Sequence, residues 1–526
     1  MKSLHGQVSM EWIARYNDSN NLNYFERAMV TDESGNVYVT GYKQVPGNSG
    51  DYATLKYNSS GVLLWSAFYD GPAQAFEDPK SIAIDNQKNV YVTGYSTGNG
   101  NNYATVKYNS EGVEQWVARF TGPQFKDFAN VVKVDKNRNV YVTGYGLRAD
   151  SDYDYLTIKY DQLGNQQWIR TYNGTGNGFD RATAMAIDDS GNVIVTGYSN
   201  GIGTLNRSDF ATLKYSPDGD LKWVERYNSL SDFRAIANAV VVDRYGNVYV
   251  TGEADSIYQD FATIKYNNNG VLQWAARYNG PEQNNDVPYS IALDSSGNVL
   301  VAGTSYYNFT TVKYNTDGTE LWVDRYKGLD STYDEAYALA TDKFDNVYVT
   351  GYTSGGPGAY ADYTTIKYDP NGNMNWVEIY NSGGADDIAH SIGLDTSGNV
   401  YISGSVDNNN INKFATIKYS QLTRINTISS QVLNEYRLLQ NYPNPFNPVT
   451  EINFTIPVES KINLVVYDIN GKEISILVNG LQNAGNYSVA WDASNFASGI
   501  YFYKLIGFNS NNGVNYSETK KMLLVK

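Results

Sequence analysis

Acidic side chains recur at one position of this sequence, where they could bind a cation or an amine. The position lies eight residues before an aspartate that itself recurs eight times, and six of its eight occupants are Glu77, Asp127, Asp180, Asp286, Asp334 and Asp387. Carboxylate oxygens are ligands that Ca²⁺ prefers in proteins. The alternative is that each carboxylate accepts hydrogen bonds from nearby backbone N–H groups where the chain turns.

A second acidic group has the alternate spacing of a calcium-binding loop. Asp150, Asp152 and Asp154 are each separated by one residue, but the following glycine and the distal glutamate of such a loop are absent. These three residues form a candidate metal site. The sequence predicts no cofactor other than Ca²⁺ at a site of this kind.

The composition leaves little basis for catalysis. The chain has two histidines, His5 and His390, and no cysteine, so His-based triads, cysteine nucleophiles and His/Cys zinc sites are excluded. A pair of carboxylates could still act as in a glycosidase, yet no pair stands out among 55 acidic residues. We assign no catalytic residue and favour a noncatalytic protein.

The charge excludes two further classes of function. Forty basic and 55 acidic residues give a net charge of -15, and no Lys/Arg-rich run interrupts the chain. A binder of nucleic acid or of an anionic membrane would show a basic patch. We therefore expect neither nucleic-acid binding nor a membrane span, because no stretch of 18 apolar residues occurs either.

The candidate residues lie within a repeat, and this repeat must position them. Its tryptophans are spaced by 48 to 55 residues: Trp12, Trp65, Trp116, Trp168, Trp223, Trp274, Trp322 and Trp376. An aspartate recurs at Asp32, Asp85, Asp135, Asp188, Asp243, Asp294, Asp342 and Asp395, and a Thr-aliphatic-Lys-Tyr segment ends at Tyr419 in the last copy. A unit of this size cannot bury its apolar faces alone and must pack against its neighbours.

Each repeat predicts four short strands, which we call a, b, c and d. They are rich in Val, Ile, Tyr, Thr and Trp and are separated by Gly/Asn/Asp/Ser clusters, as in residues 81–85, 89–95, 103–108 and 115–120. Eight such units predict an all-β fold, an eight-bladed β-propeller over residues 1–420. The chain enters at strand d near Trp12 and leaves at strand c near Tyr419, so the N-terminal strand should complete the last blade.

Loop lengths separate the two faces of the predicted propeller. The a–b and c–d turns have constant lengths, whereas the b–c loops vary by up to seven residues, since the gap from strand-b Gly to strand-c Thr runs from 8 to 15. Loops on a rigid scaffold commonly carry recognition residues, and these are rich in Asn, Gly, Tyr and Asp. We expect a glycan or a protein ligand on the variable face of a monomeric propeller, although loop variation can also reflect tolerance of insertions.

The repeat ends near Ser420, and the remaining chain forms a second domain. Residues 421–437 are predicted as a linker, and residues 438–526 alternate polar and apolar residues in short runs typical of a small Ig-like β-sandwich. The domain opens with a proline-rich segment whose marked residues are Asn441, Pro443, Asn444, Pro445, Phe446, Asn447 and Pro448. Prolines at this spacing favour an extended entry segment.

Two resemblances concern the repeat. The c–d turn at 57–65 resembles the repeat of quinoprotein dehydrogenases, whose family places a quinone cofactor on the channel axis, often with Ca²⁺ and a disulfide of adjacent cysteines that this chain lacks. The unit Ile82–Tyr95 more closely resembles the bacterial SBBP β-propeller repeat, over about residues 6–420. This second resemblance implies an extracytoplasmic propeller and supplies no ligand.

The C-terminal domain resembles the type A sorting domain of the type IX secretion system. The resemblance rests on Asn441–Thr450, Val466–Gly471, Trp491-Asp492, the segment around Gly499 and the closing residues up to Lys526. It implies a translocon and a sortase-like protease as partners, cleavage within 421–437, and a location outside the cell or on the outer-membrane surface. The family's cleavable inner-membrane signal is not seen in Met1–Glu11.

Together these features predict a secreted or surface-displayed propeller that binds or scaffolds without catalysis. Two alternatives remain open at this point. One is an extracellular propeller enzyme, either a carboxylate-based glycosidase or lyase or a quinone-dependent dehydrogenase. The other is a structural surface-layer component that would associate with itself.

Overall fold

The computed structural model describes seventeen segments of the chain. They are residues 8–16, 22–45, 49–98, 100–148, 152–176, 178–200, 208–227, 234–255, 258–328, 331–355, 360–383, 385–407, 411–421, 425–429, 435–493, 496–508 and 514–526. These residues form strands and turns, and no helix within them could cross a membrane.

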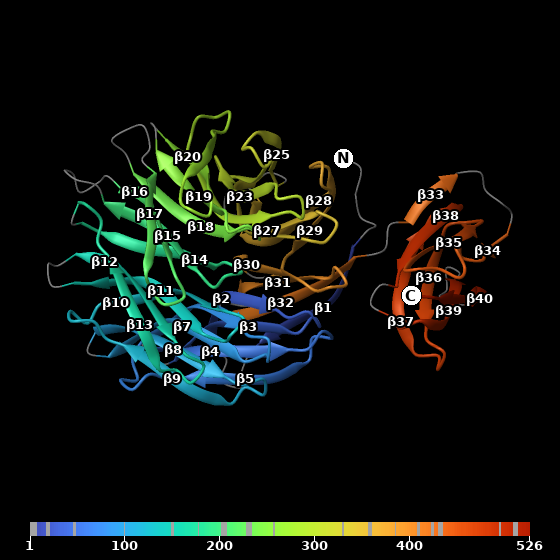
Figure 1. Cartoon of the computed structure of the whole chain (residues 1–526). Coiled ribbons are helices and arrows are strands. Elements are labelled where there is room, and N and C mark those ends of the chain that lie inside the picture. The colour runs from blue at the N-terminus through green and yellow to red at the C-terminus, as the bar shows by residue number, and fades with distance from the viewer. Residues whose placement is uncertain are drawn as a thin grey trace. The chain divides into compact units, whose positions relative to one another are not determined.

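Eight four-stranded antiparallel sheets form the first part of the chain, and they are the blades of an eight-bladed β-propeller. Blades 1 to 7 run from β2–β5 to β26–β29 in chain order, as the colours of Figure 1 show from blue to orange. Blade 8 has the order β1-β32-β31-β30, so the first strand of the chain completes it. The predicted fold and the predicted closure are both confirmed.

The b and c strands in the middle of each blade carry most of the buried residues, as in β11, β12, β15 and β16. The a strands are β2 (Asn23–Thr31), β6 (Glu77–Ile84), β10 (Asp127–Val134), β14 (Asp180–Ile187), β18 (Ala235–Val242), β22 (Asp286–Leu293), β26 (Ser331–Thr341) and β30 (Asp387–Leu394). The b strands are β3 (Val37–Val45), β7 (Val90–Gly98), β11 (Val140–Leu147), β15 (Val193–Asn200), β19 (Val248–Asp255), β23 (Val299–Ser305), β27 (Val347–Gly355) and β31 (Val400–Asp407).

The two outer strands of each blade follow the same order. The c strands are β4 (Ser49–Tyr57), β8 (Gly100–Tyr108), β12 (Tyr153–Tyr160), β16 (Ser208–Tyr215), β20 (Gln259–Tyr266), β24 (Asn308–Tyr314), β28 (Ala361–Tyr368) and β32 (Asn412–Gln421). The d strands are β5 (Leu63–Tyr69), β9 (Glu114–Phe120), β13 (Gln166–Tyr172), β17 (Leu221–Tyr227), β21 (Leu272–Tyr278), β25 (Glu320–Tyr326), β29 (Met374–Tyr380) and β1 (Val8–Tyr16).

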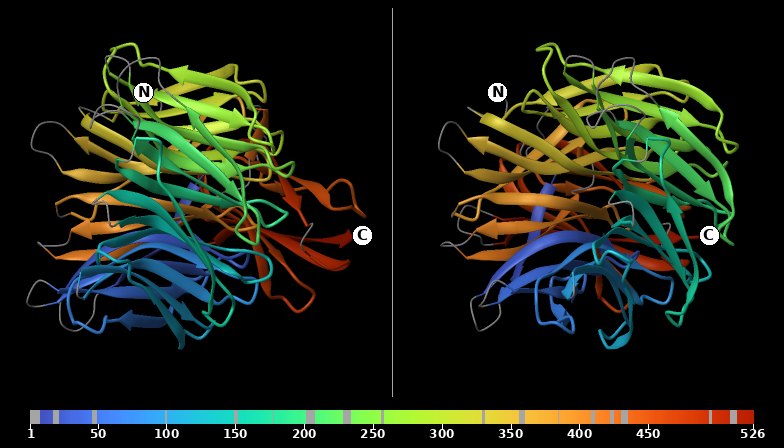
Figure 2. Two further views of the ribbon diagram at one scale, coloured as in Figure 1. Left: turned by 60° about the vertical axis from the view of Figure 1, so that its left-hand side comes forward. Right: turned by 90° about the vertical axis from the view of Figure 1, so that its left-hand side faces the viewer.

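The a strands are innermost, because each contacts the a strands of both neighbouring blades. The contacts run from β2 through β6, β10, β14, β18, β22 and β26 to β30, and β30 in turn contacts β2. The ring is therefore closed, and the succession of blades can be followed from two further directions in Figure 2. A closed ring leaves no open seam between the first and last blades.

Seven of the eight blades hold the next blade through one carbonyl oxygen of its c–d turn. In blade 1 the indole Nε1 of Trp65 and the ammonium of Lys56 both donate to Ser110 O of blade 2, at 3.0 and 3.1 Å. The same pairing closes the ring, where Trp12 on β1 and Lys418 on β32 both donate to Ser59 O of blade 1. Further tryptophans bond the equivalent carbonyls of Gln162, Pro217, Asn268, Thr316 and Pro370.

The indole ring also lies against a glycine of the same turn. The glycine at Gly372 has φ +86°, and a Cβ there would lie 2.7 Å from the ring of Trp322. A side chain is thus excluded by contact as well as by backbone conformation. The strand-c lysine can also lie over the ring of a strand-b tyrosine, as Lys56 Nζ does at 5.0 Å from the ring centre of Tyr38. This cation–π contact adds to the same interface.

The recurrent aspartate fixes the a–b turn. Asp32 Oδ1 accepts hydrogen bonds from the backbone N–H groups of Ser34 and Asn36, and Oδ2 accepts from the Asn36 amide and the Tyr38 hydroxyl. A carboxylate with this set of donors needs a turn of constant length. The constant a–b spacing of the sequence follows from this bonding.

The second part of the chain is a β-sandwich of two four-stranded sheets. One sheet has the order β33-β38-β35-β34 and the other β37-β36-β39-β40. Their bounds are β33 (Ile425–Ser429), β34 (Arg437–Leu438), β35 (Val449–Ile456), β36 (Ser460–Tyr467), β37 (Glu473–Gln482), β38 (Gly485–Asp492), β39 (Gly499–Phe508) and β40 (Val514–Leu524). Phe454, Leu464, Val489, Trp491 and Tyr503 lie in the core between them.

Contacts divide the chain into one unit of Glu11–Lys418 and another of Tyr419–Lys526 together with Met1–Met10. The predicted linker 421–437 differs from this division in one respect. Strand β33 lies within it and pairs with β38, with Ile425 opposite Val489. A polar stretch without repeat anchors therefore supplies an edge strand of the sandwich.

We predict that two glycine substitutions will differ although both glycines have positive φ. Gly398→Ala, with φ +81° and no atom within 4 Å of the added Cβ, should lower the free energy of unfolding by about 1–2 kcal/mol through backbone strain alone. Gly372→Ala should lower it by about 1–3 kcal/mol more, because the methyl group also displaces Trp322. Denaturant unfolding of both variants measures the difference, and equal losses would contradict the packing role of the indole.

Candidate functional site

The six acidic residues that precede the a strands are fully buried. Each has 0% exposure and lies at or near the first residue of its strand. Five of them accept a hydrogen bond of 2.5–3.0 Å from a backbone N–H of the preceding crossing, from Gly122 to Asp127, Gly174 to Asp180, Gly280 to Asp286, Gly328 to Asp334 and Ser382 to Asp387. The structure thus has the capping arrangement at these five positions, and none of them faces an open channel mouth.

Burial also shifts the ionisation of these groups. It is the largest cause that raises the pKa of Asp127, Asp180, Asp286 and Asp387, while the backbone N–H donors oppose it. The carboxylates therefore hold the crossings in place at some electrostatic cost. They are not placed to contact a substrate.

The sixth residue, Glu77, has different surroundings. Its carboxylate and those of Asp51 and Asp70 offer ligand oxygens that lie within 4.8 Å of one another, the one such trio in the described part of the chain. Burial, followed by the nearby Asp70 and Asp51 charges, raises the pKa of Glu77 to about 7, against the lowering effect of hydrogen bonds from Ser96 and from the Gly71 backbone. This cluster is the part of the propeller whose donor set could hold a metal ion.

The structure describes only two residues of the calcium-like trio predicted from the sequence. Asp150 lies outside the described residues. Asp152 is half-buried and its carbonyl accepts the N–H of Arg148, while Asp154 is buried in β12 opposite Gly146. The metal site at these residues stays a prediction.

One set of residues near the axis has no counterpart in the sequence-based prediction. Every a strand has an irregular register opposite the strand-b glycine, as between Ala129 and Val131. The residue within this bulge differs from blade to blade: Arg27, Lys80, Asn130, Thr183, Asn238, Tyr289, Tyr337 and His390. These residues lie five positions before the recurrent aspartate, where the residue type differs from one repeat to the next. That variation is the sequence signal that could have identified them.

These bulge residues form an aromatic and a charged group. The rings of Tyr289 and Tyr337 lie 5.2 Å apart, and that of His390 lies 5.7 Å from Tyr337. In the charged group, Arg27 and Lys80 both bond the buried carboxylate of Asp78. The innermost strands therefore carry individual side chains on otherwise identical blades.

The variable face carries an exposed aromatic cluster, which we call the tyrosine patch, formed by Tyr306, Tyr307 and Tyr333. Tyr306 and Tyr307 make the two-residue b–c turn of blade 6, with φ of 42° and 61°, and their exposed fractions are 43% and 45%. Tyr333 lies on β26 of blade 7, is 48% exposed, and its ring centroid is 4.3 Å from that of Tyr307. This contact places the b–c turn of one blade beside the d–a crossing of the next.

The conformation of this turn is unusual for its residues. A left-handed conformation disfavours bulky side chains, and two consecutive tyrosines adopt it here. Glycine, asparagine or aspartate would relieve the strain. Backbone strain of this kind occurs preferentially at functional sites.

In the sandwich, the proline-rich motif has a buried support and an exposed loop. The Asn441 side chain donates to Pro443 O and Thr450 Oγ1, and Phe446 is buried against Trp491. Pro443, Asn444, Pro445 and Asn447 are exposed, Pro448 is half-buried, and Tyr442 is 79% exposed. Gly499 begins β39, and the Lys526 N–H donates to Ser498 Oγ.

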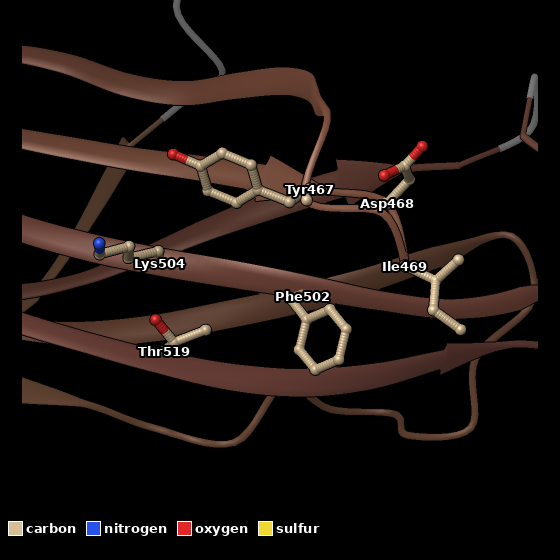
Figure 3. Close-up of a pocket in the computed structure, with 7 residues that line it drawn as sticks. Tyr467, Asp468, Ile469, Phe502, Lys504 and Thr519 are labelled. Atoms are coloured by element: carbon tan, nitrogen blue, oxygen red, sulfur yellow. The ribbon is translucent and has the colours of Figure 1, made fainter.

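A shallow hollow of about 380 Å³ lies on the outer side of the second sheet. Tyr467, Asp468, Ile469, Gly471, Phe502, Lys504 and Thr519 line it, and Figure 3 shows Phe502 near Ile469 and Lys504 further along the sheet near Tyr467. Ile469 is exposed although it is apolar. Together with the exposed Tyr442 loop, the hollow gives this domain surfaces that a protein partner could contact.

Comparisons with protein families match both parts of the chain. The model of the secretion system C-terminal sorting domain matches residues 440–524. The SBBP model, a beta-propeller repeat, matches residues 78–101, 273–310 and 325–359. No curated protein matches the chain.

The solved structures that match this chain have low sequence identity to it. Sqt1 from Chaetomium thermophilum is 9% identical, with 78% of this chain and 99% of that chain covered and a TM-score of 0.49. The beta-propeller domain of the Trilobed protease from Pyrococcus furiosus is 6% identical, with coverages of 67% and 98% and a TM-score of 0.40. A polysaccharide lyase, an ulvan lyase, is 11% identical, with coverages of 68% and 94% and a TM-score of 0.39.

The buried caps generate a prediction about pH. Because burial raises the folded-state pKa of Asp286 above its ordinary value of 3.8, its ionisation should reduce stability as pH rises from about 3.8 through the folded pKa. Asp286→Asn keeps an oxygen for the Gly280 N–H and removes the charge, so its free energy of unfolding relative to wild type should increase over that window. Glu282 and Arg325, which also act on Asp286, are present in both proteins.

The matched variant Asp286→Ala should be destabilised by about 1–3 kcal/mol at every pH, since the buried Gly280 N–H loses its acceptor. Denaturant unfolding between pH 4 and pH 8 measures both variants. A difference between Asp286→Asn and wild type that does not change with pH would contradict the raised pKa.

Proposed function

Because the blades are SBBP beta-propeller repeats and the chain ends in a type IX C-terminal sorting domain, we propose that this protein is an exported, noncatalytic module that binds a glycan on its variable face. The sorting domain directs export to the cell surface or the extracellular space and implies contact with the secretion machinery. The proposal adds the ligand and the surface that binds it.

The tyrosine patch is the observation that carries this proposal. Three half-exposed rings from two blades stand together on one face, and two of them are held there at the expense of backbone strain. Tyrosine offers a flat apolar surface with a polar hydroxyl, which suits stacking on the apolar face of a sugar ring while bonding its hydroxyl groups. A hydrophobic protein partner would call for a larger continuous apolar patch.

The remaining chemistry agrees with binding rather than turnover. The caps Asp127, Asp180, Asp286, Asp334 and Asp387 are buried and bonded to backbone, so they offer no carboxylate pair to a substrate at the surface. The net charge of -15 disfavours polyanions such as nucleic acid. A neutral or weakly charged polysaccharide fits both observations.

We predict that Tyr307→Ala will weaken glycan binding at least about tenfold, or about 1.4 kcal/mol, because the substitution removes the central ring of the patch. The matched control is Tyr245→Ala, since Tyr245 is 66% exposed in an a–b turn on the opposite face. A glycan array with the full chain identifies the ligand, and calorimetry with that glycan compares both variants with wild type.

The two alternative functions left open by the sequence, an enzyme and a structural surface-layer component, give different results in this experiment. A glycan that is cleaved during incubation would identify an enzyme. Concentration-dependent self-association without glycan binding would identify a structural surface-layer component. Equal affinities of Tyr307→Ala and wild type would remove the tyrosine patch from the binding surface.

A further prediction concerns export through the Tyr442 loop. In a bacterium with a type IX system, the chain preceded by a cleavable inner-membrane signal should reach the cell exterior, and the chain lacking residues 438–526 should stay inside. Tyr442→Ala should reduce the exported fraction severalfold if the machinery contacts this exposed loop. Val458→Ala, at a residue 57% exposed in another turn of the sandwich, serves as the control and should be exported normally.

A further inference from the structure

Three carboxylates from two blades meet where the chain crosses from blade 1 to blade 2. Asp51 lies on β4, Asp70 follows the last residue of β5, and Glu77 begins β6. Their ligand oxygens lie within 4.8 Å of one another. Glu77 is fully buried, Asp51 is 8% exposed, and Asp70 is open to solvent, so an ion could enter past Asp70 and contact the two buried groups.

The two carboxylate oxygens of Glu77 are bonded differently. Oε1 accepts a hydrogen bond of 3.0 Å from Ser96 Oγ. Oε2 is buried, and no donor among the described residues bonds it. Such an oxygen destabilises a protein unless something replaces its lost water. A cation held between Glu77, Asp51 and Asp70 would do so.

The protein's own cations compensate this cluster only in part. Lys43 pairs with Asp51, with Nζ 3.0 Å from Oδ2. Arg119 lies behind the cluster and donates to Ser96 Oγ and to the Tyr69 hydroxyl. Asp70 has an exposed carboxylate, and its pKa is raised by burial and by the Asp51 charge. Negative charge therefore exceeds the positive charge that directly contacts the carboxylates.

The other crossings of the same repeat show what this one lacks. Strand d of blades 4 and 5 carries an arginine that pairs with the strand-c aspartate, as Arg226 does with Asp209 and Arg277 with Asp260. At the equivalent position blade 1 has Phe68. The residue in the place of Asp70 is elsewhere Asn17, Thr121, Asn173, Asn228, Asn279, Lys327 or Asn381. Only the first crossing thus combines an acid at all three positions with no arginine.

We propose that Asp51, Asp70 and Glu77 bind one Ca²⁺ ion between blade 1 and blade 2. Oxygen-only ligands without histidine or cysteine favour a hard cation, and Ca²⁺ binds oxygen at 2.3–2.6 Å. Ca²⁺ accepts about six to eight oxygen ligands in a flexible geometry, whereas Mg²⁺ demands a near-octahedral one. Water and the solvent-exposed side of Asp70 leave room for the remaining ligands.

The site would act as a clamp between blades rather than as part of the glycan surface. It joins a c strand and a d strand of one blade to the a strand of the next, so the bound ion would stabilise this interface. A binding constant of about 10⁻⁴–10⁻³ M is usual for calcium sites of extracellular modules. The export of this chain would expose it to calcium at such concentrations.

Isothermal titration of the full chain with CaCl₂, after removal of bound metal with a chelator, tests the proposal. One ion per chain should bind wild type, and the thermal unfolding midpoint should rise with calcium because the ion binds the folded state. Asp70→Asn, which installs the residue found at several other crossings, should weaken calcium binding at least about tenfold while the protein stays folded. Glu77→Gln should abolish the calcium-dependent rise of the midpoint.

Asp317→Asn is the matched control, because Asp317 is also acidic, is exposed in the c–d turn of blade 6, and lies outside every candidate metal site. It should bind calcium as wild type does. Binding that is absent in wild type, unchanged in Asp70→Asn, or lost in Asp317→Asn would overturn the assignment. The outcome is independent of the glycan array, since the ion site and the tyrosine patch share no residue.

Discussion

The structure depends on a single polar contact repeated around the ring. In seven of the eight blades the indole N–H donates to a carbonyl in the c–d turn of the next blade, and in six of these the strand-c lysine donates to the same oxygen. The indole ring packs on the glycine of that turn. These bonds join neighbouring blades around the ring. The bonds of Trp12 and Lys418 to Ser59 O join the last blade to the first in the same way.

This constraint explains how structure and function are divided between the faces. The a–b and c–d turns are fixed by carboxylate and indole bonding, so their lengths and residues cannot change freely. The b–c turns and d–a crossings lie beyond these contacts. The tyrosine patch, the cluster of Asp51, Asp70 and Glu77, and the bulge residues all lie near them, where individual blades can differ without loss of the ring.

Much of the fold can be predicted from the sequence because the same pattern of strands and turns occurs in eight copies. Trp12, the recurrent aspartates and the frame offset predict the blades and their closure. The carboxylate cluster could not be predicted in this way, because its members come from three strands and only pairing of β4 with β5 and packing on β6 bring them together. The tyrosine patch could not be predicted either. The exposure of Tyr306 and Tyr307 depends on a two-residue turn whose left-handed conformation their residue types do not indicate. Strand β33 was missed because an edge strand needs only backbone bonds to β38, and its sequence Ile-Asn-Thr-Ile-Ser lacks strict alternation of apolar and polar residues.

Amide hydrogen exchange of strand β1 tests the ring most directly. If β1 completes blade 8 and Trp12 bonds Ser59, the amides of residues 8–16 should be as protected as those of the equivalent strands β5, β9 and β13, because all belong to closed blades. Exchange of β1 within seconds while the other d strands remain protected would show an open seam. That result would contradict the account in which every blade is held by the next.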